Sequence, residues 1–217
     1  TELLHQFAKD KQAVFYACNE CTDDEQLARF SRRMLATGMP ASQYVNTFET
    51  WETALKSMLE LPGDGKKLLI IDEFPYMAQG NRAIPSILQN LWDHVLQREH
   101  VMLVLCGSSI SFIERDLLGE KNPLYGRATG IYRLQPLSFR ESRGFFPHSS
   151  LQTQLTYYAI LGGIPHYLQQ FDDDASIGEN VEKQILRRGS ILSSEVEFLL
   201  HQELRETAVY NVIIEAI

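Results

Sequence analysis

Apolar positions in the first half of the chain follow two different spacings. Continuous apolar runs at 12–18, 67–71 and 101–106 predict strands that are buried on both faces. Between them, apolar residues recur three and four positions apart, most clearly over 84–96, which predicts amphipathic helices. A weaker apolar stretch at 129–134 predicts one more strand. Strands separated by helices indicate the α/β fold class, a parallel sheet covered by helices on both faces.

The pattern changes after Pro136, beyond which only helical spacing remains. Ser176 stands three residues before Glu179, the capping-box spacing that starts a helix. We therefore expect an α/β domain over residues 1–137 and an all-helical subdomain over 138–217. Because the last ten residues have the pattern of an interrupted helix, we also expect the polypeptide to continue downstream.

Charge and hydrophobicity narrow the range of functions. The 217 residues include 20 Lys and Arg against 28 Asp and Glu, a net charge of −8, which argues against a basic nucleic-acid surface. The longest apolar runs fall far short of the roughly 20 residues that cross a bilayer. No basic and apolar leader opens the chain. We expect a cytoplasmic protein without a membrane partner.

Three cysteines are too few for a disulfide scaffold. Cys18 and Cys21 have the spacing of a redox or zinc pair, but a structural zinc needs about four ligands and the sequence offers no second pair. We interpret them as cysteines at the end of a strand, with the redox or metal role as the alternative.

The strongest candidate for chemistry is the pair Asp72 and Glu73, which directly follows the apolar run ending at Ile71. In open α/β sheets, ligands bind at the carboxyl ends of the strands. One carboxylate there can hold Mg²⁺, and the next can orient or deprotonate an attacking water. This is the Walker B arrangement of P-loop NTPases. The alternative is that both residues only cap the segment that follows.

A Walker B pair requires a phosphate-binding loop earlier in the chain. Gly65-Lys66 does not fit, because Glu60 stands where the loop needs its first glycine and Lys67 where it needs Ser or Thr. Thr1 opens an amphipathic segment and would be the metal-binding hydroxyl at the end of such a loop if Gly-Lys stood just upstream. Otherwise Thr1 is an ordinary helix cap.

Over nearly its whole length the chain resembles the prokaryotic "archaeal ATPase" family of AAA+ P-loop NTPases, which are related to the STAND ATPases. The order and spacing of seven short motifs carry this resemblance. They are Thr1-Glu-Leu-Leu, Phe48-Glu-Thr-Trp51, Leu69-Ile-Ile-Asp72-Glu73-Phe-Pro-Tyr76, Leu105-Cys-Gly-Ser108-Ser, Pro123-Leu-Tyr-Gly126-Arg127, Leu134-Gln-Pro-Leu-Ser138-Phe and Leu161-Gly-Gly-Ile-Pro165-His-Tyr167.

The resemblance implies ATP and Mg²⁺ as cofactors and assigns roles to the motif residues. Asp72 and Thr1 would hold the metal, and Glu73 would polarise the attacking water. Ser108 stands at the sensor-1 position and would hydrogen-bond the water or the γ-phosphate, or else cap the next helix. Arg127 would be an arginine finger donated to a neighbouring copy in a homo-oligomer, or else an ordinary exposed loop arginine.

In the helical part, the resemblance points to Gly163 and Pro165. STAND ATPases have a Gly-x-Pro motif whose proline packs on adenine, and glycine permits close approach of a backbone. The alternative is a helix–turn–helix corner without a ligand. The resemblance therefore implies that the α/β domain is followed by a helical lid.

The main departure from the family is that its phosphate loop and the strand before that loop are missing. In AAA+ sheets this strand lies between those that end at Ser108 and near Gln135. We therefore expect the polypeptide to extend upstream and the chain as given to bind nucleotide poorly and to lack ATPase activity. Relatives usually continue downstream into a winged-helix region and often a nuclease-like domain, so any DNA contact would belong there.

Three functions remain at this point. The first is an ATP-dependent molecular switch, in which hydrolysis moves the helical lid against the sheet. The second is a non-catalytic regulatory or protein-interaction module with an ATPase-like fold. The third, a metal-dependent nuclease using Asp72 and Glu73, is disfavoured, because it needs a third carboxylate and a strand-borne lysine, whereas Lys66 and Lys67 precede the strand.

Overall fold

The structure is a computed structural model that describes residues 2–108, 112–117, 119–193 and 195. Its internal contacts divide the chain into two units, Thr1–Ile131 and Tyr132–Ile217. Each unit has a hydrophobic core of its own, and each is described separately below.

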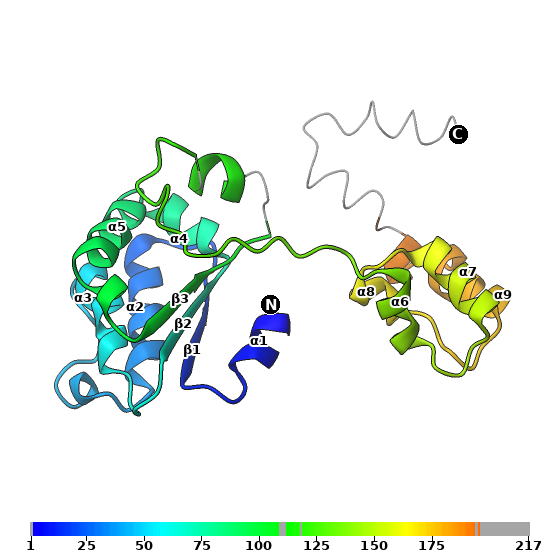
Figure 1. The fold of residues 1–217 in the computed structure, drawn as a ribbon, viewed down its shortest axis with the longest axis horizontal. Coiled ribbons are helices and arrows are strands. Elements are labelled where there is room, and N and C mark those ends of the chain that lie inside the picture. The colour runs from blue at the N-terminus through cyan, green and yellow to red at the C-terminus, as the bar shows by residue number, and fades with distance from the viewer. Residues whose placement is uncertain (1, 109–111, 118, 194, 196–217) are drawn as a thin grey trace. The chain divides into compact units, whose positions relative to one another are not determined.

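A three-stranded parallel sheet forms the centre of the first unit (Figure 1). Its strands are β1 (Ala13–Ala17), β2 (Lys67–Asp72) and β3 (Val101–Leu105), in the order β1-β2-β3. All three fall in apolar runs that predicted strands, so these predictions are confirmed. Ala17 pairs with Asp72, and Ile71 pairs with Leu105. The carboxyl ends of the three strands therefore lie side by side at one edge.

Helices cover both faces of this sheet, as expected. Figure 1 shows α1 (Glu2–Ala8) on one side of the strands and the other helices of the unit on the opposite side. Those helices are α2 (Asp23–Leu35), α3 (Trp51–Lys56), α4 (Phe74–Gly80) and α5 (Ile84–His94). Short 3₁₀ turns occur at η1 (Pro40–Gln43), η2 (Ser57–Glu60) and η3 (Leu96–Arg98), and a π-helical turn at η4 (Phe112–Leu117).

Helix α2 illustrates how local signals and packing combine. It begins after Thr22, whose hydroxyl accepts a hydrogen bond from the amide of Glu25 at 3.3 Å and so satisfies one unpaired amide of the first turn. Its buried face places Phe30 edge-on to Tyr16 of β1, with ring centroids 5.1 Å apart, and 5.5 Å from Trp51 of α3. Such aromatic contacts tie the helix layer to the sheet.

The prediction of a strand at 129–134 is wrong. This segment has no regular secondary structure, and the side chains of Ile131, Tyr132 and Leu134 are 68%, 84% and 62% exposed. An apolar stretch becomes a strand only when a neighbouring strand supplies backbone hydrogen bonds. Within the described residues, β2 is paired on both sides and no strand lies along the second edge of β3.

The described part of the second unit contains helices joined by loops and no strand, in agreement with the pattern after Pro136. It contains α6 (Phe139–Ser142), η5 (Arg143–Phe145), α7 (Leu151–Leu161), α8 (Pro165–Leu168), α9 (Ile177–Val181), η6 (Glu182–Leu186) and η7 (Ile191–Ser193). The capping box predicted at Ser176 and Glu179 is present. Tyr157 and Phe171 pack edge to face in the small core.

Over the described ranges, no helix combines the length and apolar character needed to cross a membrane.

Asp23 joins three helices of the first unit. Its carboxylate accepts hydrogen bonds from Trp51 Nε1 at 2.7 Å and from Asn81 Nδ2 at 2.8 Å. Asp23 begins α2, Trp51 begins α3 and Asn81 follows α4. A single side chain therefore fixes where these three helix ends meet.

We predict that Asp23→Ala lowers the free energy of unfolding by about 1–3 kcal/mol, because two partly buried donors lose their acceptor. Asp24→Ala is the matched control, since Asp24 is exposed and lies in the same first turn. Its loss should stay below about 1 kcal/mol, the usual size of a helix-dipole effect. Urea denaturation of both variants measures the difference, and equal losses would contradict the role given to Asp23.

Candidate functional site

The candidate site lies at the carboxyl edge of the sheet, where the backbone ties three strand ends together. The amide of Cys18 donates to the carbonyl of Asp72 at 2.9 Å, and the amide of Cys106 donates to the carbonyl of Ile71 at 3.0 Å. These bonds continue the parallel ladders one residue beyond β1 and β3. The predicted acidic residue Asp72 is thus held between two neighbouring strands.

Asp72 is a buried carboxylate, with 5% of its surface exposed. Its Oδ1 accepts hydrogen bonds from the Glu73 amide at 3.1 Å and from Cys106 Sγ at 3.0 Å. Because side chains alternate along a strand, Asp72 lies on the same face of β2 as Leu68 and Ile70. A carboxylate is rarely this buried without polar partners, and those at Asp72 fix its orientation.

Glu73 has an unusual backbone. Its φ of 50° places it in the left-handed region, and no other non-glycine residue among those described has a positive φ. This conformation costs about 1–2 kcal/mol for a residue with a Cβ. It reverses the chain between β2 and α4, where the amide of Phe74 donates to the carbonyl of Cys106 at 2.9 Å.

The same turn brings Glu73 against Ser108. Glu73 Oε2 accepts hydrogen bonds from the Ser108 hydroxyl at 3.2 Å and from the Ser108 amide at 3.3 Å. The acidic pair and the polar residue after β3, which were predicted from separate motifs, are therefore neighbours. Glu73 itself is only half-buried, so its carboxylate remains accessible to a ligand.

Gly107 allows this close approach. A Cβ at this position would lie 2.7 Å from Cδ and 2.8 Å from Cγ of Pro75, which is closer than carbon atoms pack. Pro75 stands at the start of α4. Only a residue without a side chain lets the end of β3 pass α4 at this distance and place Cys106 and Ser108 beside the acidic pair.

The chain matches, over residues 1–171, the protein family described as "ATPase domain predominantly from Archaea". It belongs to this ATPase family. The match covers the whole sheet unit and the helical unit as far as Phe171.

Two relatives of the ATPase domain come from Methanocaldococcus jannaschii. Uncharacterized protein MJECL04 is 30% identical over 217 residues, which cover 100% of this chain and 46% of the relative. Uncharacterized protein MJ0424 is 46% identical over 46 residues, or 21% of this chain and 45% of the relative. The chain thus spans about half the length of the first relative. No solved structure matches the chain.

The acidic pair of this ATPase domain fits the metal ion that such a family implies. Carboxylate oxygens are the ligands that Mg²⁺ prefers, and Asp72 presents one at a sheet edge with its backbone fixed on both sides. Thr1, the other predicted metal ligand, lies outside the described residues. Among the residues that are described, no group of three His, Cys, Asp or Glu side chains could hold a metal ion by itself.

Two thiols near this edge, those of Cys18 and Cys106, have a raised pKa. Burial and the hydrogen bond to Asp72 raise the pKa of Cys106 to about 12, and burial raises the pKa of Cys18 to about 12. Because the thiolate is the nucleophile, a raised pKa makes both thiols poor nucleophiles at neutral pH. The thiol of Cys21 donates a hydrogen bond to Gln26 Oε1 at 3.1 Å. None of the three cysteines forms a disulfide.

Arg127 is engaged within its own unit. Its Nε and Nη2 donate to the carboxylate of Asp93 on α5 at distances of 2.7–3.0 Å. Its Nη1 donates to the carbonyls of Pro123 at 2.8 Å and Tyr125 at 3.2 Å. The predicted arginine finger therefore acts in this structure as a clamp that fixes the 123–127 turn to α5.

Gly163 and Pro165 lie in the helical unit. The amide of Leu137 donates to the carbonyl of Gly163 at 2.7 Å, and a Cβ at position 163 would come within 1.9 Å of the Leu137 carbonyl oxygen. This backbone contact alone requires glycine at position 163. Pro165 is exposed and begins α8, with Ile164 also partly exposed beside it. The corner therefore presents an apolar surface on a fixed backbone.

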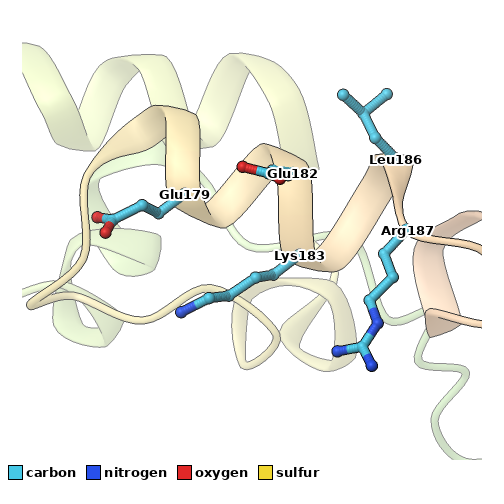
Figure 2. A pocket seen from close by; sticks show the side chains of 5 residues that line it. All are labelled: Glu179, Glu182, Lys183, Leu186 and Arg187. Carbon is cyan, nitrogen blue, oxygen red and sulfur yellow. The ribbon is translucent and has the colours of Figure 1, made fainter.

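The helical unit also has an open pocket of about 440 Å³. Figure 2 shows the five side chains that line it, Glu179, Glu182, Lys183, Leu186 and Arg187. None of the predicted site residues is among them. The mixed charges on a short, solvent-facing helical segment make this a surface depression rather than an enclosed ligand site.

Sequence reasoning did not assign a role to Cys106 or to the partner of Arg127. For Cys106 a signal existed, because extending two parallel strands by one position places residue 106 next to residue 72. Asp93 lies 34 positions before Arg127, and the sequence pattern did not indicate that the two would pair. The spacing of apolar residues does not tell which loop packs on α5.

We predict a pH-dependent contribution of the clamp to stability. The hydrogen bond from Arg127 lowers the pKa of Asp93 below its ordinary value. A folded-state pKa below that of the unfolded chain, about 3.9, stabilises the fold above this pH, and the contribution is lost as the pH falls through the folded pKa. Asp93→Asn should therefore unfold more easily than the wild type at neutral pH, with the difference shrinking below about pH 4.

Urea denaturation between about pH 7 and pH 3 measures this difference. Asp64→Asn is the matched control, because Asp64 is an exposed aspartate in a surface turn of the same unit. Its stability relative to the wild type should not follow the same profile. A deficit in Asp93→Asn that is constant across the whole pH range would contradict the clamp as an ionic interaction.

Proposed function

We propose that the chain is the core of an ATP-dependent molecular switch, with the nucleotide bound at the carboxyl edge of the sheet. The observation that carries the proposal is the pair Asp72 and Glu73, in a chain that belongs to an ATPase family. Asp72 is buried at the end of the central strand, and Glu73 contacts Ser108 at the end of the next one. This placement supports two different roles for two adjacent carboxylates.

Asp72, together with Thr1, would hold Mg²⁺. The metal ion would neutralise the negative charge that develops on the phosphate oxygens of ATP. Burial suits Asp72 for this role, because the orientation of a buried, hydrogen-bonded carboxylate is fixed before a cation binds. Binding would then cost little free energy for reorganising the side chain. Its orientation is already set by the donors on Oδ1.

Glu73 would orient the attacking water and accept its proton. It is better placed for this than Asp72, because it is more exposed and projects from the turn that follows the strand. Ser108 would position Glu73 through the two hydrogen bonds to Oε2 and would sense the γ-phosphate when the hydroxyl rotates toward it. A serine hydroxyl can serve in both ways, since it is donor and acceptor.

In the helical unit, Gly163 and Pro165 would contact the base. The exposed proline ring supports this, because a rigid apolar face next to a fixed backbone suits stacking against adenine. Arg127 would act on a neighbouring copy only after its guanidinium leaves Asp93. We assign no residue of this chain to DNA contact or to the signal that the switch responds to. These properties, like homo-oligomer formation, would be properties of the whole protein.

A second candidate is the non-catalytic regulatory or interaction module. The observation that favours it is the Arg127 clamp, since the guanidinium contacts of this residue are directed to Asp93 and to two carbonyls of its own turn. An arginine engaged in this way contributes to structure and offers no charge to a neighbour. The nuclease alternative lacks support, because no third carboxylate joins Asp72 and Glu73 in a group that could hold a metal ion among the described residues.

The proposal is tested by titrating labelled ATP, with and without Mg²⁺, into the product of the full gene and into the 217-residue chain. We expect the full-length protein to bind ATP at least about tenfold more tightly, because phosphate-binding amides and an ammonium group add charge-assisted hydrogen bonds. EDTA should weaken this binding. If the full-length protein binds no better than the chain, the switch is rejected in favour of the interaction module.

We predict that Glu73→Gln in the full-length protein retains ATP binding and lowers kcat by about 100-fold or more, the usual effect of losing a general base. Glu52→Gln is the control, since Glu52 is exposed on α3. Both variants should have the same thermal stability and the same affinity for ATP. Unchanged turnover in Glu73→Gln would remove Glu73 from its catalytic role.

A further inference from the structure

Cys106 follows β3 and is held by backbone bonds on both sides. Its amide donates to the carbonyl of Ile71 at 3.0 Å, and its carbonyl accepts from the amide of Phe74 at 2.9 Å. One bond ties it to the end of β2 and the other to the start of α4. The position of its Cβ is therefore set by the sheet and by the first turn of the following helix, so that only rotation about the Cα–Cβ bond remains to place the thiol.

From this fixed position the thiol reaches the carboxylate of Asp72. Cys106 Sγ lies 3.0 Å from Asp72 Oδ1, whereas the nearest backbone acceptor, the carbonyl of Ile71, is 3.7 Å away. The shorter contact to a charged acceptor is the stronger hydrogen bond. The amide of Glu73, which also donates to Oδ1, belongs to the adjacent residue and not to another strand. Cys106 thus gives the end of β3 a direct hydrogen bond to the Asp72 side chain.

We propose that Cys106 is a positioning residue for Asp72, whose thiol sets the orientation in which the carboxylate meets a divalent cation. The inference rests on the proposed function, since it concerns the residue expected to hold Mg²⁺. A thiol suits this task, because it is a weak donor that orients a carboxylate while competing little for its charge. In this role Cys106 would act only through Asp72, and not on the cation or the reacting atoms.

The first test compares Cys106→Ala with Cys106→Ser in the full-length protein. Alanine removes the donor, and we expect the Mg²⁺ concentration for half-maximal ATP hydrolysis to rise about fivefold, the effect of losing one modest hydrogen bond. At saturating Mg²⁺, kcat should stay within about twofold of the wild type. Serine keeps a donor and should restore the Mg²⁺ dependence to within about twofold of the wild type.

Cys21→Ala is the matched control, because it removes another thiol that contacts Gln26 rather than Asp72. Its Mg²⁺ dependence should equal that of the wild type. If alanine and serine at position 106 impair the Mg²⁺ dependence equally, the side chain acts through packing, and the proposal is overturned. The same holds if neither variant changes it.

The second test observes the contact itself in the 217-residue chain without nucleotide. The infrared S–H stretching band of Cys106 is isolated as the difference between the wild type and Cys106→Ser. In Asp72→Asn this band should move to higher frequency, because a neutral amide is a weaker acceptor than a carboxylate. A band that does not respond to Asp72→Asn overturns the positioning role directly.

The two tests separate this inference from the function on which it rests. A full-length protein without Mg²⁺-dependent ATP hydrolysis overturns the switch, and with it the cation role of Cys106, even if the infrared band responds. A protein that hydrolyses ATP with an Mg²⁺ dependence unaffected by Cys106→Ala supports the switch and overturns the inference about Cys106.

Discussion

The pairing of β2 with a parallel neighbour on each side is the constraint on which the candidate site depends. At the end of β2, the carbonyl of Asp72 accepts a hydrogen bond from the amide of Cys18 at 2.9 Å, and the carbonyl of Ile71 accepts one from the amide of Cys106 at 3.0 Å. Both neighbouring strands are therefore bonded to the last residues of β2. Because side chains alternate along a strand, a slip of one residue would turn Asp72 to the opposite face and separate it from the thiol of Cys106. The register of the sheet therefore determines the chemistry at its edge.

The turn at Glu73 adds a second constraint to this edge. A left-handed glutamate persists only where surrounding contacts outweigh its backbone cost, and here the contacts are the bonds to Ser108 and the close passage of Gly107 along Pro75. These contacts come from the end of β3, so Glu73 depends on a strand about 30 positions later in the chain. The strain supports a functional interpretation of the turn, since a purely structural connection between β2 and α4 would favour glycine at this position.

The sequence predicted the parts of the structure that depend on local pattern. Three apolar runs became the three strands, and the site proposed at the end of the second strand contains Asp72 and Glu73 with Ser108 beside them. It could not predict features that depend on which segments meet. The stretch at 129–134 has strand-like residues but no strand beside it, and the clamp on Arg127 comes from a helix whose distance in the fold no periodicity encodes.

Each unit, taken by itself, holds its predicted site residues by the same means, a glycine that admits a close approach of another segment. In the sheet unit, Gly107 passes Pro75 at a distance that leaves no room for a Cβ, and Ser108 follows beside Glu73. In the helical unit, a Cβ at position 163 would lie 1.9 Å from the Leu137 carbonyl oxygen, so only glycine permits the backbone contact that precedes Pro165. Residues held in this way by the main chain need little reorganisation when a ligand binds, which is the property that a preformed binding site requires.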